Sequence, residues 1–284
     1  MRSEEFDQKI LVCRQFKLAL RRPLVMGVVN VTPDSFSDGG NFLDASAAIE
    51  HAHQLIDEGA DILDIGGEST RPGAEPVSVD EELRRVLPII EALRTALIPI
   101  SIDTMKPAVM RAAIESGASV VNDVNGLRAP GAVEACAVSD VGVCIMHMQG
   151  QPRTMQAEPH YNDVVGEIRD FLIERAQTCE HAGIDKNRIV IDPGFGFGKS
   201  REHNLTLLRH LEEFTGLGYA VLAGLSRKSV LGKIAGQEVV SRGPASIAAA
   251  LLAVQHGAHI VRVHDVRATK DALAILAAVD QEKN

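Results

Sequence analysis

"EGADILDI" (58–65), "SGASVVND" (116–123) and "HGAHIVRVHD" (256–265) repeat one pattern along the chain. In each, a helical stretch ends at Gly-Ala, a polar residue follows, and an apolar run rich in β-branched residues leads to a polar or charged group. A continuous apolar run after a helix is typical of a parallel strand that is buried on both faces. The repeat therefore predicts an α/β protein built from βα units.

The whole chain contains eight such strands, and amphipathic helical patterns lie between them. In the first helix, Asp44 is the expected N-cap and Gly59 the end, and Pro107 and Pro244 mark the first turns of two later helices. Eight βα units predict an α/β fold of the (β/α)8 TIM-barrel type, with a doubly wound open sheet as the alternative. The expected strands are 24–29, 62–65, 98–102, 119–122, 142–147, 188–192, 219–225 and 259–264.

Domain organisation and partner classes follow from composition. No linker divides the chain, so we predict one domain over residues 1–284, in which residues 1–22 precede the first strand and form a hairpin at the barrel bottom. A net charge of −9 without a basic tail or any tryptophan argues against nucleic acid as a partner. No apolar run approaches the ~20 residues of a membrane span. An acidic N-terminus and four scattered cysteines indicate a cytoplasmic protein with reduced thiols.

Polar side chains follow every expected strand. A single polar residue at a strand end has an ordinary explanation, such as a helix cap or a turn. In a barrel, however, all eight strand ends meet at one face, and eight polar ends together favour an active site there. The residues concerned are Asn30, Glu68, Asp103, Asn122, His147, Asp192, Lys228, Arg262 and His264.

Two long loops and a group of cations indicate an anionic substrate. The segments after the first two strands are rich in glycine and carry Asp38, Thr70 and Arg71, so we expect mobile lids that close over substrate. Lys228, Arg262 and His264 come from strands 7 and 8, where barrels often bind phosphate. Because the chain is acidic overall, a local cationic cluster predicts a phosphate or diphosphate group.

Two other patterns are excluded as sites. "GFGFGKS" (194–200) resembles a phosphate-binding P-loop, but Pro193 occupies the position where the first glycine is required. His51 and His53 are two residues apart on a helix and face different directions, so they do not form a metal pair.

Eight motifs in order resemble the dihydropteroate synthase family over about residues 24–268. They are GVVNVTPDSFSDGG (27–40), DIGGESTRPGA (64–74), SIDTMKP (101–107), NDVNG (122–126), MHMQGQPRTMQ (146–156), DPGFGFGK (192–199), GLSRKS (224–229) and VRVHDV (261–266). The resemblance implies a folate-biosynthesis transferase that joins 6-hydroxymethyl-7,8-dihydropterin diphosphate to p-aminobenzoate, releasing diphosphate. It also implies Mg²⁺ as cofactor, a cytoplasmic homodimer and a target of sulfonamides.

The resemblance further assigns roles to individual residues. Asp38, Arg71 and Lys228 are the implied catalytic residues, and Asn30 the implied metal ligand. The pterin would be bound by Asp103, Asn122, Asp192, Lys228 and Arg262. The diphosphate would be bound by Asn30, Thr70, Arg71, Arg262 and His264. The p-aminobenzoate would be bound by Thr70, Arg71, Pro72, Phe197 and Ser229.

Two other functions share part of this pattern. A pterin-binding methyltransferase domain that passes a methyl group to a cobalamin would share Asp103, Asn122 and Asp192, but it binds no diphosphate and leaves the cations of "SRK" and "VRVHDV" unexplained. A catalytically silent barrel that binds only pterin or a protein partner leaves the complete set of reactive positions unexplained.

Overall fold

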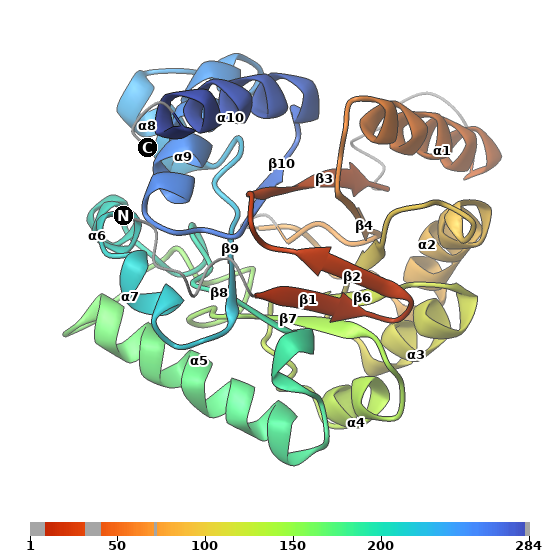
Figure 1. Ribbon diagram of the computed structural model, residues 1–284. Helices are drawn as coiled ribbons and strands as arrows, with labels where there is room; N and C mark the ends of the chain where they lie inside the picture. The colour runs from red at the N-terminus through yellow and green to blue at the C-terminus, as the bar shows by residue number, and fades with distance from the viewer. Residues whose placement is uncertain (1–8, 32–40, 71–72, 282–284) are drawn as a thin grey trace.

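Eight parallel strands close into a barrel. The computed structural model describes residues 9–31, 41–70 and 73–281. The strands follow one another around the barrel in chain order, and the last pairs with the first (Figure 1). They are β3 (Leu24–Asn30), β4 (Ile62–Gly66), β5 (Ile100–Asp103), β6 (Val120–Asp123), β7 (Gly142–Met146), β8 (Ile189–Asp192), β9 (Ala220–Ala223) and β10 (Ile260–Val263). The predicted TIM barrel is confirmed, each strand lies within two residues of its expected bounds, and the closed sheet excludes the open one.

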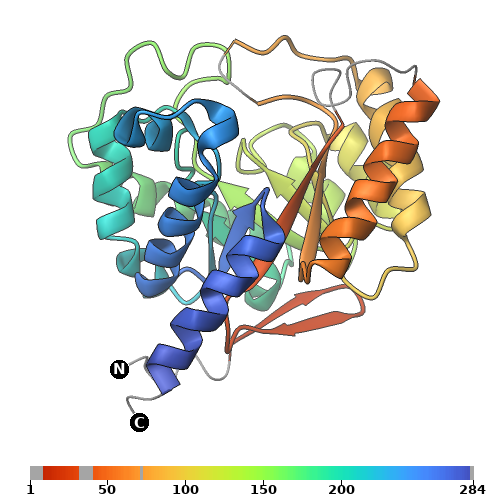
Figure 2. The ribbon, with the colours of Figure 1, turned by 90° about the horizontal axis from the view of Figure 1, so that it is seen from above.

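Helices surround the barrel on the outside (Figure 2). Ser78, Asp163 and Ser200 accept backbone N–H groups as N-caps of three of them. Pro107 begins a helix and Pro244 is the second residue of another, as expected. The helices are α1 (Asn41–Asp57), α2 (Val79–Leu93), α3 (Pro107–Ser116), α4 (Ala132–Ala137), α5 (Val164–His181), α6 (Arg201–Arg209), α7 (Glu212–Thr215), α8 (Ser229–Ala235), α9 (Gly243–Gln255) and α10 (Val266–Gln281), with 3₁₀ turns η3 (Lys186–Arg188) and η4 (Val239–Ser241).

The prediction that Asp44 caps the first helix is wrong. Helix α1 begins at Asn41, so Asp44 lies within its first turn. An acidic residue is favoured both at the N-cap and in the first turn, because both positions face the positive end of the helix dipole. Composition alone therefore does not separate the two positions.

The interior of the barrel is apolar in its lower half, at the start of the strands. Strands β1 (Ile10–Cys13) and β2 (Phe16–Ala19) form an antiparallel hairpin at this end of the barrel (Figure 2). Leu11 and Leu20 from the hairpin segment pack with Met26, Ile62 and other inward-facing residues of the strands. The hairpin thus closes the lower opening of the barrel with apolar side chains.

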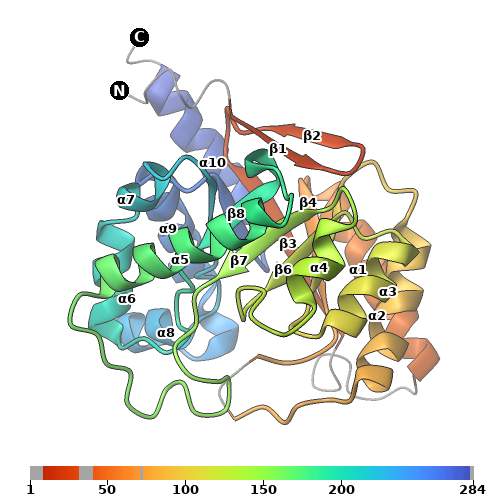
Figure 3. The ribbon, with the colours of Figure 1, turned by 90° about the horizontal axis from the view of Figure 1, so that it is seen from below.

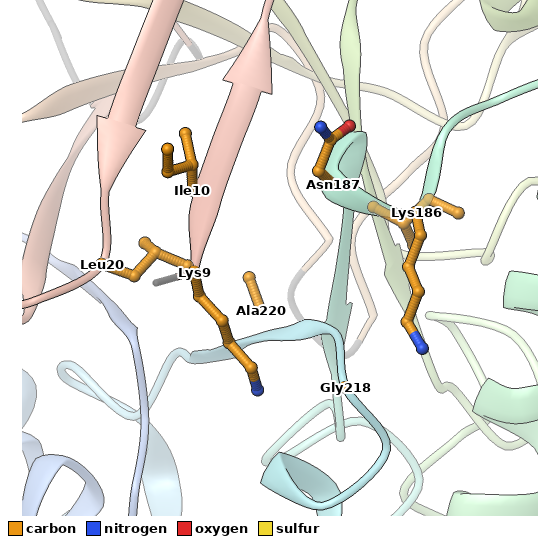
Figure 4. Close-up of a pocket in the computed structure, with 8 residues that line it drawn as sticks. Lys9, Ile10, Leu20, Lys186, Asn187, Gly218 and Ala220 are labelled. Atoms are coloured by element: carbon orange, nitrogen blue, oxygen red, sulfur yellow. The ribbon is translucent and has the colours of Figure 1, made fainter. Parts of the chain in front are cut away.

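A pocket of about 280 Å³ lies beside this hairpin, between it, η3 and the start of β9 (Figure 4). Its lining is mainly apolar and also includes two lysines. Lys9 Nζ donates to the carbonyl oxygen of Thr215, and Lys186 Nζ to that of Leu217, both at 3.3 Å. The pocket is at the opposite end of the barrel from the predicted site residues, and both ammonium groups already have protein acceptors.

Helices that could cross a bilayer are absent from the described segments, because none combines the necessary length with low polarity.

Candidate active site

The strand register places several predicted residues in one row at the upper end of the barrel. Asn30 pairs with Gly66, Gly66 with Asp103, and Asp103 with Asn122, across β3, β4, β5 and β6. Gly66 leaves space in this row, because a Cβ there would lie 3.7 Å from both the Asn30 Oδ1 and the Asp103 Cβ. The carboxyl ends of these strands therefore bring together polar side chains that are far apart in sequence.

Arg262 on β10 is at the centre of the cluster. Its Nε donates to Asp64 Oδ2 at 2.6 Å, and its Nη2 donates to Asp103 Oδ2 at 2.8 Å. Asn122 Nδ2 donates to the same Asp64 oxygen at 3.1 Å. Both Asp64 and Asn122 are buried, and Asp64 Oδ1 is a buried oxygen without a partner. Three predicted pterin residues thus form one hydrogen-bonded group with Asp64.

Asp64 was not predicted from the sequence. It stands in the middle of the apolar strand "ILDIG", which suggested burial rather than function. The available signal was its position two residues before Gly66, since residues two apart on a strand face the same side. A charge on the inward face of a barrel strand needs a partner, and Arg262 provides it.

Burial and neighbouring charges shift the proton affinities of this group. Burial raises the pKa of Asp103 to about 7, with Asp64 acting in the same direction and Arg262 against it. Burial alone would lower the pKa of Arg262, but the carboxylates of Asp64 and Asp103 raise it above its ordinary value. The guanidinium therefore stays charged, while Asp103 changes protonation near neutral pH.

A second group lies at the ends of β8 and β9. Asp192 Oδ1 accepts the Gly194 N–H at 2.7 Å, and burial raises the pKa of Asp192 although Lys228 opposes the change. Lys228 donates to the carbonyl oxygen of Phe195, and its Nζ lies 4.6 Å from the centre of the Phe197 ring. Burial lowers the pKa of Lys228 to about 8. Three predicted residues, Asp192, Lys228 and Phe197, thus come together here. Ser229 is exposed and is the first residue of α8, directly after Lys228.

The glycines of "GFGFG" allow a close approach of the backbone to neighbouring segments. Gly194, Gly196 and Gly198 have φ angles of 72°, 81° and 63°, which favour glycine. A Cβ on Gly194 would overlap the carbonyl oxygen of His147, and one on Gly196 would lie 3.0 Å from the Lys228 Cδ. The loop therefore packs directly against the end of β7.

The two cations after β9 have different surroundings. Arg227 Nη2 forms an ion pair with Asp265 Oδ1 at 2.7 Å, and Arg227 has a φ of 57°. Lys228, the next residue, instead contacts the loop that carries Phe197. After β10, His264 Nδ1 lies 2.9 Å from Ser226 Oγ, which fixes the imidazole beside the end of β9.

The loop after β4 is anchored at its base. Lys106 Nζ forms ion pairs with Glu68 at 2.8 Å and with Glu82 at 2.5 Å, and Glu68 Oε1 accepts the Val77 N–H at 3.0 Å. Thr70 lies half-buried on this loop. The predicted residues Asp38, Arg71 and Pro72 lie outside the described residues.

The loops after β4 and β7 lie at the end of the barrel opposite the hairpin (Figures 2 and 3). An ion pair of 3.3 Å between Arg153 Nη2 and Glu75 Oε1 joins them. The long loops therefore gather on the same face as the strand ends that carry the polar cluster.

Within the described residues, no group of three or more His, Cys, Asp or Glu side chains is arranged to hold a metal ion. The half-buried Asn30 contributes an amide oxygen beside Gly66. Mg²⁺ often keeps several waters and binds one or two protein oxygens together with substrate phosphates. A single amide oxygen therefore fits an ion that arrives with a diphosphate, and does not fit an ion held by the protein alone.

Buried carboxylates, an amide and a guanidinium at the mouth of a TIM barrel suit a flat heterocycle with several N–H groups. A family model described as "Pterin binding enzyme" matches residues 26–264. The fold and the site thus define a pterin-binding barrel enzyme.

Comparison with individual relatives narrows this class of enzyme to one family. The dihydropteroate synthase of Escherichia coli (strain K12) is 48% identical over 92% of this chain and 93% of its own length. The structure of Xanthomonas albilineans dihydropteroate synthase with 4-aminobenzoic acid is 55% identical, with a TM-score of 0.90 and coverage of 95% and 98% of the two chains. That of Burkholderia cenocepacia dihydropteroate synthase with 7,8-dihydropteroate is 51% identical, with a TM-score of 0.89 and coverage of 97% and 98%. The chain therefore belongs to the dihydropteroate synthase family of transferases, which confirms the resemblance seen in the motifs.

Proposed function

We propose that this protein joins 6-hydroxymethyl-7,8-dihydropterin diphosphate to p-aminobenzoate, giving 7,8-dihydropteroate and diphosphate. The observation that carries this proposal is the buried group formed by Arg262, Asp64, Asp103 and Asn122. The aminopyrimidinone edge of a pterin presents N–H donors side by side, which carboxylates accept in pairs. Asp103 and Asp192 are suited to this edge, and Asn122 supplies both a donor and an acceptor.

Arg262 has a further function in this pocket. Its planar guanidinium is held by two carboxylates, so little side-chain entropy is lost when a flat ring stacks against it. Lys228, which follows the neighbouring strand β9, supplies an N–H donor beside Arg262. These groups orient the pterin with its exocyclic methylene towards the loops.

The first chemical step breaks the bond between this methylene carbon and the diphosphate oxygen. Both bonding electrons leave with the oxygen, and the positive charge left on the methylene is delocalised into the electron-rich pterin. Asn30, Thr70, Arg71, Arg262 and His264 are the residues we assign to the diphosphate, whose negative charge they stabilise. The Asp38 carboxylate is assigned to the developing cation.

The amine of p-aminobenzoate then attacks the methylene carbon and loses a proton, which completes the new C–N bond. We assign the pocket for this acid to Thr70, Arg71, Pro72, Phe197 and Ser229. The Phe197 ring offers an aromatic wall, and the Lys228 ammonium lies 4.6 Å from its centre.

Mg²⁺ is the proposed cofactor, with Asn30 as its protein ligand. When bound, the ion neutralises charge on the leaving diphosphate. The amide oxygen of Asn30 would hold the ion at the end of β3, next to the diphosphate.

The assembly we propose is a cytoplasmic homodimer formed through α9 and α10. These helices lie side by side (Figure 1) and carry Leu252, Ile275 and Val279, whose exposed fractions are 45%, 69% and 51%. Exposed apolar residues on adjacent helices favour a protein interface. Sedimentation equilibrium of the wild type and of Ile275→Glu tests this: a dimer that the substitution dissociates is expected, and a monomeric wild type would contradict it.

Diphosphate release by the purified protein tests the function. The pterin diphosphate is supplied with and without p-aminobenzoate, and with and without Mg²⁺. We expect Mg²⁺-dependent release, with dihydropteroate formed when the acid is present, and a loss of at least a hundredfold in kcat/KM for Asp103→Asn. The matched control is Asp271→Asn on the exposed side of α10. Tight pterin binding without product would instead favour the methyltransferase or silent-barrel functions, and an Asp103→Asn variant as active as the wild type would refute the site.

A further inference from the structure

Lys199 is a buried lysine at the end of the "GFGFGK" loop, and it has no role in the mechanism above. Its exposed fraction is 2%. Its Nζ lies 2.9 Å from the Phe197 carbonyl oxygen, 3.3 Å from the His147 carbonyl oxygen and 3.0 Å from the His147 Nδ1. An ammonium group has three N–H donors, so each donor has one acceptor here.

All three of these acceptors belong to uncharged groups. Burial lowers the pKa of Lys199 well below its usual range, although Asp192 acts in the opposite direction. Burial, Lys199 and Arg128 lower the pKa of His147 to about 2, so the imidazole is neutral. The tautomer that carries its proton on Nε2 accepts from Lys199 at Nδ1. Taking an ammonium out of water in such surroundings costs free energy. A hydrophobic side chain would fill the same position without that cost.

The hydrogen bonds of Lys199 join two segments that are distant in sequence. His147 directly follows β7, and its ring is held edge-on against Phe171 at a centroid distance of 4.9 Å. Phe197 lies in the loop after β8, which approaches β7 so closely that a Cβ on Gly194 would overlap the His147 carbonyl oxygen. Lys199 therefore links a rigid strand end to the backbone of Phe197.

The rest of the loop is fixed independently of Lys199. The Gly196 N–H donates to Asn204 Oδ1 at 2.7 Å, and the Tyr161 hydroxyl donates to the Gly198 carbonyl oxygen at 2.8 Å. Between these two points, the carbonyl of Phe197 is bound by Lys199. Removing the ammonium would thus release this one peptide group while the ends of the loop remain in place.

The position of the Phe197 ring depends on that peptide group. The ring lies under Lys228 Nζ at 4.6 Å and packs against the buried methionines Met146, Met148 and Met155. A rotation of the Phe197 backbone moves the ring relative to both Lys228 and this methionine group. Loss of the Lys199 hydrogen bonds is therefore expected to weaken the binding of a ligand that packs against the Phe197 ring.

We propose that Lys199 is a positioning residue for the second substrate: by holding the Phe197 carbonyl against the end of β7, it fixes the aromatic wall of the p-aminobenzoate pocket. Lys199 touches neither substrate. The inference rests on the proposed function, because Phe197 is assigned to p-aminobenzoate there. It predicts an effect on one substrate and little effect on the other, whereas a general structural role would change both.

Steady-state kinetics of Lys199→Met test the proposal. Methionine fills the volume of the lysine stem and removes all three donors. We expect the KM for p-aminobenzoate to rise at least tenfold and the KM for the pterin diphosphate to change less than twofold. Thermal stability should change little, because the cost of burying the lysine amino group is removed while its buried acceptors lose a donor. Lys233→Met, on the exposed side of α8, is the matched control and should leave both constants unchanged.

A pair of variants at His147 tests the same link without changing Lys199. Asparagine places its Oδ1 close to the position of the imidazole Nδ1, so His147→Asn keeps the acceptor, and His147→Leu removes it. We expect the KM for p-aminobenzoate to be higher in His147→Leu than in His147→Asn by about fivefold or more. This comparison of the two His147 variants still tests the proposed role of Lys199 if Lys199→Met fails to fold.

Amide hydrogen exchange gives a readout that does not depend on turnover. In Lys199→Met, peptides covering residues 194–199 should exchange at least tenfold faster, and peptides from the strands should not change. Unchanged exchange here, or KM values for the two substrates that rise by the same factor, would overturn the proposal. A wild type that forms no dihydropteroate would instead refute the proposed function, and exchange would still report whether Lys199 holds the loop.

Discussion

Asp103→Asn should make the protein more stable while it removes activity. Burial raises the pKa of this carboxyl from 3.8 to about 7, so the folded state holds its proton more tightly than the unfolded state does. The stabilising contribution of that proton is complete below about pH 3.8, falls as the pH rises, and is lost once the pH passes about 7. Above that pH the folded protein carries an ionised carboxylate that its surroundings disfavour.

The magnitude follows from the difference in pKa. One pKa unit corresponds to about 1.4 kcal/mol, so the ionised carboxylate costs on the order of 4 kcal/mol above pH 7. Asparagine is neutral at every pH and keeps an oxygen that accepts from Arg262, which also retains its pair with Asp64. Part of the gain is offset because the bond to Arg262 is then no longer ionic. We expect a net stabilisation of about 2–4 kcal/mol at pH 8.5 and less than half of that at pH 5.

Urea unfolding followed by circular dichroism measures this difference. The wild type, Asp103→Asn and the exposed control Asp271→Asn are compared at pH 5.0 and pH 8.5 at constant ionic strength, and unchanged m values confirm that the midpoints report stability. Two outcomes would refute the reasoning: a variant less stable than the wild type at pH 8.5, or a gain of the same size at both pH values. The expected result would show that the Asp103 carboxylate serves ligand binding although it lowers the stability of the protein.

Three further changes have definite expected outcomes. Burial acts to raise the pKa of Asp61, but its hydrogen bonds hold that pKa below the ordinary value. Asp61→Asn should therefore lower the free energy of unfolding by about 1–2 kcal/mol at pH 7, and the difference should shrink as the pH falls below about 4. Equal stability of the two proteins at pH 7 in urea unfolding would contradict this. Gly194→Ala should lower the free energy of unfolding by at least about 3 kcal/mol, because its Cβ would overlap a backbone oxygen. Gly183→Ala should lower it by only about 1 kcal/mol, because Gly183 also has a positive φ, of 92°, but has open space around it. Equal losses in the two variants would mean that the backbone angle alone determines the cost. Lys106→Met leaves the carboxylates of Glu68 and Glu82 without their cation. It should therefore lower the free energy of unfolding, measured by calorimetry, by about 3–5 kcal/mol. A loss below about 1 kcal/mol would show that the ion pairs contribute little to stability.

The sequence was sufficient to predict the barrel and much of its upper face. Strand positions followed from apolar runs, and strand ends such as Asp103, Asn122 and Asp192 followed from the rule that active sites lie past those ends. Both rules use only residues that are close together in the chain. They also predicted which side chains share a face, because all parallel strands end at the same edge.

The contacts that join distant segments were not predictable in this way. Asp64 interrupts an apolar run, and only the register across the barrel shows that its carboxylate faces Arg262. Lys199 stands in a glycine-rich loop, and its partner His147 is 52 residues away. His147 was expected among the polar strand ends, but its ring instead packs against Phe171. Such pairs depend on how the strands are staggered, which local patterns do not specify.

The apolar hairpin at the start of the strands has a kinetic consequence. Leu11 and Leu20 close that end of the lumen, so ligands enter and leave only past the loops at the opposite end. The group around Arg262 lies on the strands, and Phe197 lies above it on a loop. A molecule bound at the upper position blocks the path to the lower one. We therefore expect compulsory-order kinetics, in which the pterin diphosphate adds first and p-aminobenzoate second.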